Sequence, residues 1–417
     1  MKIFTLKNLS LVVCTLLAAS TLYFFDHLKN IGLIIDYFDT YDPEHISENF
    51  RSMYQRYPSA RIENNGKTIK LPNALRDFPF PEQYEFLNEQ RVSREFVSAS
   101  HTTGLAVLHN GELIYEFYDR GNRRDSYSIQ MSVGKVYTSF LIGKLLEEGY
   151  INSIEDSVDT YVLELRGTAF EGVTIRQLLD MTAGIRWVED ISDLTSELVR
   201  STYASMTDTM DEFVKTIVRE REPGTYHHYA TVNHYVLGLL IRDASGMSYN
   251  DYFQQKMWSK IGAESHAWLQ GPPGGVANMP YIRLRDMLRF GYVYANSGKN
   301  MAQEQIIDPE WIAYSSAPDH PMLEPGSDNP LSSSYHGYKN QWWFPLNYDQ
   351  EFAALGIFGQ ILYVNKKHNV VIAKTSSYEH ESEDGGWRRM EAVILFQQTA
   401  RWLHEQHSLE TKIQTAP

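Results

Sequence analysis

The chain has 417 residues, of which 43% are hydrophobic and 13% aromatic, so it can bury a large folded core. Its formal net charge of -14 would repel the phosphates of nucleic acid, which argues against a nucleic-acid partner. Cys14 is the single cysteine, so the body of the chain offers neither a disulfide nor a thiolate metal site.

The N-terminus has the pattern of a targeting or anchoring segment, assigned to residues 1–25. Lys2 and Lys7 precede an uncharged apolar stretch at positions 9–25. This length is short for a membrane-spanning helix and sufficient for the core of a signal peptide. Small residues at 18–20 could form a cleavage site, but the apolar stretch continues beyond them, which favours an uncleaved signal anchor over a cleaved signal peptide. We therefore expect an exported protein on the periplasmic side of the bacterial inner membrane.

Secondary structure is predicted along the rest of the chain from hydrophobic spacing and turn residues. Residues 26–95, aromatic and interrupted by prolines, predict an extended lead-in that wraps the body. An Asn-Gly pair predicts a β-hairpin at 104–118, and helical spacing predicts a helix over 129–149. Mostly helical patterns follow from 165 to 330. Later elements are strands at 337–344, 355–364 and 369–376 and a helix at 387–404.

Strands at both ends with helices between them predict an α/β fold of the α+β type. In this fold class an antiparallel sheet is flanked by helices and carries an inserted, mostly helical domain. The predicted domains are an α/β lobe at 96–165 and 331–410 and a helical lobe at 166–330.

Ser132 and Lys135 form the only pair in which a lysine follows a serine by three residues, and they open a predicted helix. Residues at this spacing share a helix face, and the helix N-terminus stabilises a developing alkoxide. The pair matches the nucleophile and base of serine β-lactamases and penicillin-binding proteins. So short a motif also arises by chance, so other residues of the chain are needed to establish whether Ser132 and Lys135 are catalytic.

A proton relay is the second requirement of such chemistry. The turn at Pro223 and Gly224 leads the chain into Tyr229, which an apolar helix follows. At this loop-to-helix junction the phenol of Tyr229 can project into a cleft beside a lysine and act as a base.

At these residues the chain resembles the class C β-lactamase-related serine hydrolases, a penicillin-binding-protein-like family. It is most similar to the branch that contains 6-aminohexanoate-dimer hydrolase and its esterase-like relatives. The resemblance spans roughly residues 95–405, and it rests on 132–135, 178–187, the passage around Tyr229, and 355–360. It implies a β-lactamase/transpeptidase-like fold.

The resemblance also implies roles for individual residues. Ser132 would be the nucleophile, Lys135 and Tyr229 the proton relay, and the backbone N–H groups of Ser132 and Ile357 the oxyanion hole. Neither a cofactor nor a metal is expected. Gly356 is expected to contact substrate because a residue without Cβ lets the backbone come close.

Aromatic residues are further candidates to line the cleft. Trp187 is expected to contact substrate, and Trp342 and Trp343 are candidates as well, although aromatic residues more often belong to the core.

The chain departs from the family pattern at two positions, and a sequence similar to each missing motif occurs elsewhere. Thr231 stands where the lactamases have asparagine, while a Tyr-x-Asn sequence at 294–296 ends a predicted helix and is interpreted as surface structure. Ala354 stands where a strand lysine would bind a β-lactam carboxylate, which argues against penicillin hydrolysis. The Lys-Thr-Ser sequence at 374–376 lies one strand later and is interpreted as a chance match.

Several alternatives remain open at this point. His227, His228 and His234 suggest a metal site, but there is no HExxH motif and no adjacent carboxylate, which disfavours it. The expected substrate is a small ester, amide or peptide-like molecule. The rival activities are those of a β-lactamase or a D-alanyl-D-alanine carboxypeptidase. A penicillin-recognising binding protein that acylates without turnover is the rival from another class. The oligomeric state is undetermined.

Overall fold

A computed structural model describes residues 39–271, 275–276, 279–326, 336–379, 381 and 386–415 of the chain, with side chains as far as 409. The predicted anchor at 1–25, including Cys14, lies outside these residues. Within the described ranges, no helix is both long enough and apolar enough to cross a membrane.

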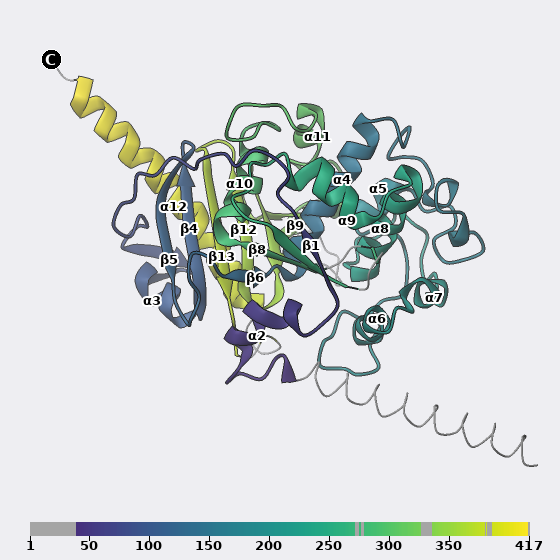
Figure 1. The fold of residues 1–417 in the computed structure, drawn as a ribbon. Coiled ribbons are helices and arrows are strands. Elements are labelled where there is room, and N and C mark those ends of the chain that lie inside the picture. The colour runs from purple at the N-terminus through teal and green to yellow at the C-terminus, as the bar shows by residue number, and fades with distance from the viewer. Residues whose placement is uncertain are drawn as a thin grey trace, which may run out of the picture.

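A seven-stranded antiparallel sheet with strand order β5-β4-β13-β12-β11-β10-β9 forms the centre of the molecule (Figure 1). Strands from the two ends of the chain meet where β4 pairs with β13, which confirms the predicted sheet. The Asn110-Gly111 turn of the predicted hairpin joins β4 to β5. The strands are β4 (Thr102–His109), β5 (Glu112–Tyr118), β9 (His336–Lys339), β10 (Trp342–Pro345), β11 (Glu351–Gly356), β12 (Gln360–Asn365) and β13 (Val370–Ser376).

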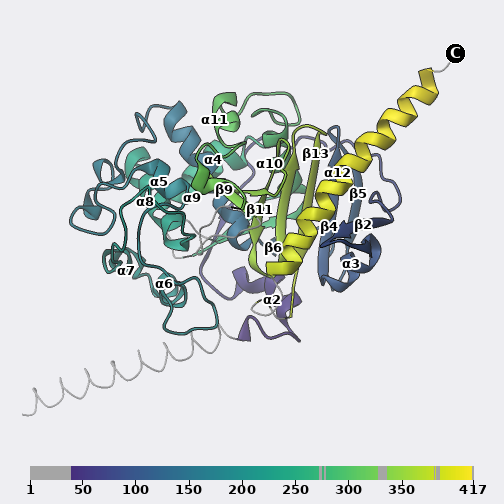
Figure 2. The same ribbon diagram turned by 180° about the vertical axis from the view of Figure 1, so that it is seen from behind.

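Both faces of this sheet are buried, because successive side chains of a strand point in opposite directions and helices cover each side. On β4, Leu105 packs into the hydrophobic core beneath α12 (Gly386–Thr415), which crosses one face of the sheet (Figure 2). Its neighbour Ala106 belongs to the larger core on the other face, together with residues of α4 (Gly134–Glu147) and α10 (Leu284–Ala295).

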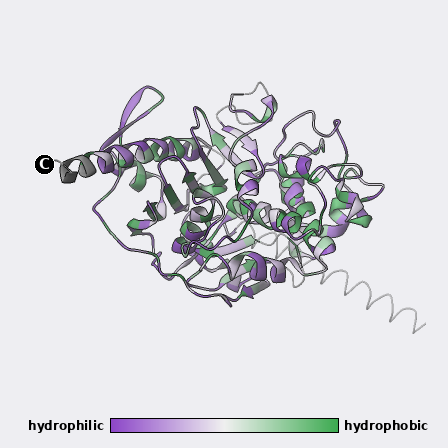
Figure 3. Cartoon of the chain, turned by 90° about the horizontal axis from the view of Figure 1, so that it is seen from above, coloured by the Kyte–Doolittle hydropathy of each residue, from purple (hydrophilic) through white to green (hydrophobic). Residues whose placement is uncertain are grey.

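The helical lobe lies beside the sheet and is organised around α8, which packs against α4 and α5. Gly246 ends α8 with a left-handed backbone (φ 69°), a conformation that glycine adopts without steric cost. In Figure 3, the loops at the outside of the molecule are mostly purple, the colour of hydrophilic residues. The helices of this lobe are α5 (Ile175–Leu179), α6 (Glu197–Met206), α7 (Met210–Lys215), α8 (Thr231–Ser245), α9 (Tyr249–Phe253) and α11 (Pro309–Tyr314).

A second, four-stranded antiparallel sheet with order β1-β7-β8-β6 connects the lead-in to the body. Its last strand, β6, runs directly into the short 3-10 helix η2 (Met131–Val133) and then into α4. The strands are β1 (Ser59–Ile62), β6 (Tyr127–Ile129), β7 (Ala267–Gln270) and β8 (Met279–Arg283). The described lead-in also contains α2 (Ile46–Ser52), β2 (Gln83–Phe86), β3 (Glu89–Val92) and α3 (Ser93–Ala99).

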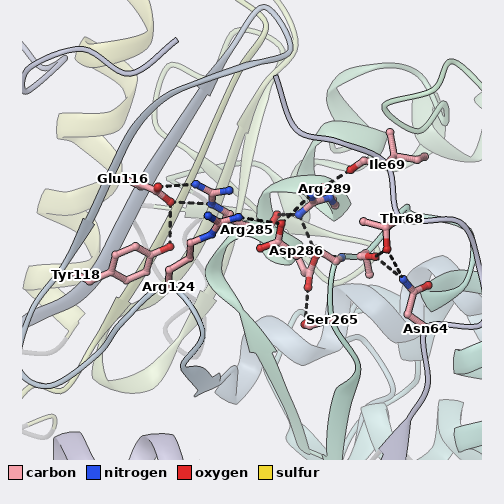
Figure 4. A network of polar contacts seen from close by, with 12 residues as sticks. Asn64, Thr68, Ile69, Glu116, Tyr118, Arg124, Ser265, Arg285, Asp286 and Arg289 are labelled. Atoms are coloured by element: carbon pink, nitrogen blue, oxygen red, sulfur yellow. Dashed lines mark hydrogen bonds and ion pairs between the residues drawn. The ribbon is translucent and has the colours of Figure 1, made fainter. Parts of the chain in front are cut away.

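A buried polar network ties the lead-in and the β4–β5 hairpin to α10 (Figure 4). Arg285 on α10 donates to both carboxylate oxygens of Glu116 on β5, at 2.8 and 2.5 Å. Arg289 donates to the Ile69 carbonyl at 3.1 Å and to Asp286 at 3.0 Å. Since charged groups that leave water must be paired, these bonds satisfy the network and hold the lead-in against the body.

Two strands predicted as continuous are hairpins in the structure. The predicted strand at 337–344 reverses at Asn340 and Gln341, whose φ angles are 50° and 70°. The predicted strand at 355–364 reverses in η7 (Ile357–Gly359), where Phe358 has φ 60°. Two consecutive left-handed residues make the tight turn that antiparallel strands require. The first turn was not predicted from the sequence because neither of its two residues is a glycine.

The surroundings of α10 correct one further expectation, which concerns Tyr294. α10, placed by the sequence in the helical lobe, packs on β12 and β13 of the seven-stranded sheet. Tyr294, interpreted from the sequence as surface structure, is 0% exposed, and its ring packs 4.7 Å from that of Trp342. The apolar face of α10 is drawn into the core, so the end of this helix is buried as well.

Candidate active site

Ser132 lies in η2 (Met131–Val133), between β6 and α4. Because β6 pairs with β8, the sheet fixes the direction from which the chain enters this turn. The preceding residue, Met131, is 5% exposed and has a left-handed backbone with φ 47°, which is uncommon for a residue with a side chain.

Lys135 lies in the first turn of α4 and is 5% exposed. Its Nζ donates a hydrogen bond to Ser132 Oγ at 3.1 Å, so the two side chains meet as the sequence spacing predicted. The contact places a proton acceptor or donor directly on the expected nucleophile.

Tyr229 precedes α8 by two residues, at the predicted loop-to-helix junction. Its ring centroid lies 5.1 Å from Lys135 Nζ. The ring is stacked on that of Trp343, with centroids 5.4 Å apart and planes at 27°, and meets the edge of Tyr338 at 5.9 Å. The fold therefore brings Ser132, Lys135 and Tyr229 together, and the aromatic neighbours fix the orientation of the phenol.

Ser132 and Tyr229 line a cavity of about 480 Å³. Its walls come from the nucleophile turn, the loops beside α8, strands β9 to β11 and the start of α12, so residues far apart in the sequence share one site. The lining residues are Ser132, Glu189, Asp190, Ile191, His228, Tyr229, His336, Trp343, Leu355, Ile357, Glu381, Gly386 and Arg389.

Ile357, the second expected oxyanion donor, follows β11 and lines the same cavity as Ser132. Gly356, just before it, brings β11 close to the nucleophile turn. A Cβ at this position would lie 3.0 Å from both the Gln130 carbonyl oxygen and the Met131 Cβ. The structure therefore explains this glycine by the close packing of two turns, and a contact of Gly356 with substrate stays a prediction.

Trp187 is 3% exposed and is not among the described residues that line the cavity. Its indole N–H donates to the carboxylate of Glu189, which does line it. The backbone N–H of Thr231 donates to the same carboxylate at 3.1 Å. Trp187 thus reaches the cavity through Glu189, and a direct contact with substrate stays a prediction for it too.

The three histidines of the suggested metal site differ in their surroundings. His227 is 0% exposed, and burial lowers its pKa to about 3. His228 is half-buried and lines the cavity, and burial lowers its pKa as well. His234 lies in α8 and is largely buried. Over the described ranges, no three His, Cys, Asp or Glu side chains are placed to hold a metal ion.

Several residues that line the cavity were not found by sequence reasoning, among them Glu189, His336, Glu381 and Arg389. Burial, followed by the charge of Arg389, lowers the pKa of His336 to about 4, so this imidazole is neutral at neutral pH. Arg389 forms an ion pair with Glu381. No local motif marks these positions, since only the fold brings them to Ser132.

Ala354, Lys374 and Trp342 are not among the described residues that line the cavity. Ala354 is 1% exposed in the core that faces α10, so its position supplies no cation to the site. Lys374 is 0% exposed, and its Nζ contacts the Ser376 hydroxyl. Trp342 is 0% exposed and belongs to the core, while Trp343 lines the cavity.

Comparison with known proteins agrees with this fold. Residues 90–394 match the Beta-lactamase family. The 6-aminohexanoate-dimer hydrolase of Paenarthrobacter ureafaciens is 26% identical over 311 residues, which cover 70% of this chain and 77% of that protein.

Solved structures show the same architecture. A Bacillus anthracis protein provisionally described as a 6-aminohexanoate-dimer hydrolase superposes with a TM-score of 0.77 at 24% identity, covering 88% of this chain and 96% of its own. A family VIII carboxylesterase superposes with a TM-score of 0.56 at 18% identity, covering 72% of this chain and 95% of its own.

The chain belongs to the β-lactamase family, because the family match extends over most of its length. It is a serine hydrolase of that family. The predicted fold class and the family resemblance are thereby confirmed.

Proposed function

We propose that the protein cleaves a carboxylic ester or amide through a covalent acyl-enzyme on Ser132. The observation that carries this proposal is the 3.1 Å contact between Lys135 Nζ and Ser132 Oγ at the wall of the cavity. The position of Tyr229 supports it, since its ring lies 5.1 Å from Lys135 Nζ and lines the same cavity as Ser132, where a second base can join the proton transfer.

The proposed reaction has an acylation and a deacylation step. Ser132 Oγ attacks the carbonyl carbon while Lys135 and Tyr229 take up its proton. The N–H groups of Ser132 and Ile357 stabilise the oxyanion, and the leaving alcohol or amine receives the proton. Water then attacks the acyl-enzyme by the same relay and releases the acid. The cycle uses no cofactor.

The substrate class follows from the missing strand cation. With Ala354 in place of a lysine, a β-lactam carboxylate loses a charge-assisted hydrogen bond, so short uncharged esters or amides are the favoured substrates. Relatives named as a 6-aminohexanoate-dimer hydrolase and a carboxylesterase support amide or ester cleavage. A β-lactamase, a D-alanyl-D-alanine carboxypeptidase and a non-turnover penicillin-binding protein are the competing outcomes of the test below.

The location is part of the same proposal. The charge and hydropathy pattern of residues 1–25 supports an uncleaved anchor that tethers the catalytic body on the periplasmic side of the inner membrane.

A substrate panel tests the proposal directly. Wild-type protein is assayed with p-nitrophenyl esters, nitrocefin and a linear amide oligomer, beside Ser132→Ala and the control Ser128→Ala. Ser128 lies on β6 and does not line the described cavity. We expect ester or amide turnover that Ser132→Ala reduces by several orders of magnitude and Ser128→Ala leaves in place. Labelling of Ser132→Ala by a fluorophosphonate at the wild-type rate would refute the nucleophile, and acylation by penicillin without turnover would favour the binding protein.

A further inference from the structure

We propose that the first described part of the lead-in, residues 39–57, positions the oxyanion hole by holding the two turns that carry its N–H groups. This inference rests on the proposed function, because it assigns the oxyanion hole to Ser132 and Ile357. The residues concerned are positioning residues that do not touch the substrate.

Each expected donor adjoins a residue with a left-handed backbone. Met131, just before Ser132, has φ 47°, and Phe358, just after Ile357, has φ 60°. Residues with a Cβ are strained in this region and keep it only where the surrounding structure holds them. The two turns therefore depend on packing from outside themselves.

The lead-in supplies that packing. Met131 and Phe358, 5% and 2% exposed, belong to one hydrophobic cluster together with Phe50 of α2. The Tyr41 ring stacks on the Phe358 ring, with centroids 5.1 Å apart and planes at 11°. Phe50 meets the same ring edge-on, at 5.3 Å and 79°. Two aromatic side chains of the lead-in thus enclose the side chain that fixes the second turn.

Further hydrogen bonds hold both the turn at Phe358 and helix α2 in place. The Phe358 N–H donates to Glu381 Oε2 at 2.6 Å, which ties the turn to the start of α12 through the Arg389 ion pair. The hydroxyls of Ser47 and Ser377 lie 2.6 Å apart and tie α2 to the end of β13. Figure 1 shows α2 next to β6, the strand that leads to Ser132, and the two elements are in contact.

The consequence concerns the rate of the chemical step. Oxyanion donors accelerate a reaction only when they are oriented before the charge develops. Because the lead-in holds both turns, weakening its aromatic contacts should lower kcat while KM changes little. The segment that follows the expected membrane anchor would then determine the efficiency of the active site.

Two substitutions at one position separate backbone strain from side-chain packing. Phe358→Ala removes the ring and keeps the left-handed strain, so the turn should relax and kcat should fall about ten- to a hundred-fold. Phe358→Gly removes the ring and the strain together, because glycine adopts this backbone freely, and should recover at least part of kcat. Tyr41→Leu, at a half-buried position where folding is little affected, should lower kcat in the same direction.

A matched pair of substrates reports on the oxyanion hole itself. An ester and its thionoester differ in the atom that the donors bind, and sulfur accepts hydrogen bonds poorly. The ratio of kcat for the ester to kcat for the thionoester should fall in Phe358→Ala and Tyr41→Leu. Phe80→Ala is the control, because Phe80 packs against Phe78 in a separate core and should leave the ratio unchanged.

Unchanged kcat and an unchanged substrate ratio in both Phe358→Ala and Tyr41→Leu would overturn the inference. Ester turnover that still depends on Ser132 in those variants would leave the proposed function intact. Ester turnover by the wild type that survives Ser132→Ala would instead overturn the proposed function, and the assignment of the oxyanion hole with it.

Discussion

The carboxylate of Glu189 accepts hydrogen bonds from both the backbone N–H and the hydroxyl of Thr231, the first residue of α8. The N-cap residue of this helix is Ala230, whose side chain cannot accept a hydrogen bond. Glu189 therefore caps α8 from a distant loop, where a carboxylate also interacts favourably with the helix dipole. Since Tyr229 precedes the helix by two residues, we expect the cap to position the Tyr229 side chain as well.

Thr231→Val should weaken this cap, because it removes the hydroxyl and keeps the backbone N–H and the side-chain shape. We expect a loss of about 0.5–1.5 kcal/mol in the free energy of unfolding and a several-fold lower kcat. Urea unfolding and steady-state ester hydrolysis measure the two effects. Thr207→Val, at the end of α6, is a control for loss of a hydroxyl far from the cavity. A Thr231→Val protein with wild-type kcat would show that the cap does not position Tyr229.

Tyr229→Phe keeps the ring and its stacking on Trp343 and removes only the hydroxyl. Loss of a general base should lower kcat about a hundred-fold or more, with little change in stability. Tyr294→Phe serves as the comparison, because Tyr294 is buried in the core away from the cavity and should retain kcat. The opposite result, with activity lost only in Tyr294→Phe, would reassign the relay.

Nitrocefin should be a poorer substrate than short uncharged esters or amides, because Ala354 offers no cation to its carboxylate. A missing charge-assisted hydrogen bond is worth about 1.5–3 kcal/mol, which corresponds to roughly a ten- to hundred-fold lower kcat/KM. Parallel measurement of kcat/KM for both substrate types decides this. Nitrocefin hydrolysis as fast as that of an efficient enzyme would favour a β-lactamase.

Lys374→Met should stabilise the protein at neutral pH. Burial lowers the pKa of Lys374 well below its usual range, and Arg388 lowers it further. Between the folded and unfolded pKa values only the unfolded chain binds this proton, so the free energy of unfolding rises with pH, by up to about 1.4 kcal/mol per unit. The destabilisation by Lys374 disappears completely only above the unfolded pKa of about 10.4.

Denaturant unfolding of wild type and Lys374→Met from pH 6 to pH 10 measures this effect. The variant should lose the pH slope that Lys374 contributes, and its advantage should shrink as the pH rises. Lys299→Met, at an exposed lysine, should keep the wild-type slope. Parallel pH profiles for wild type and Lys374→Met would show that Lys374 is charged in the folded protein.

Full-length protein should remain in the membrane fraction of expressing cells and be extracted only by detergent. Its catalytic body should be digested by protease added from the outer face, because residues 1–25 have the pattern of an anchor with an exported C-terminal side. Fractionation followed by N-terminal sequencing tests this. A soluble periplasmic product that begins at Thr21 would identify the segment as a cleaved signal peptide.

Much of the fold and the centre of the site could be predicted from the sequence, because they depend on local spacing. The three-residue interval between Ser132 and Lys135 places both side chains on one face of the chain whatever surrounds them, and the structure has their contact at 3.1 Å. The Asn-Gly turn between β4 and β5 is equally local, since both residues favour a left-handed backbone. The motif around Tyr229 likewise identified the start of α8.

Tertiary structure decided what depends on distant contacts. Glu189 meets Thr231, and Glu381 meets Phe358, only after segments that are distant in the sequence pack together. Burial of Tyr294 and Lys374, both outside the cavity, likewise follows from packing of α10 and α12 against the sheet, which their local sequence does not encode. The physical reason is that hydrogen bonding and burial depend on distance in space, whereas a sequence pattern reports only neighbours along the chain.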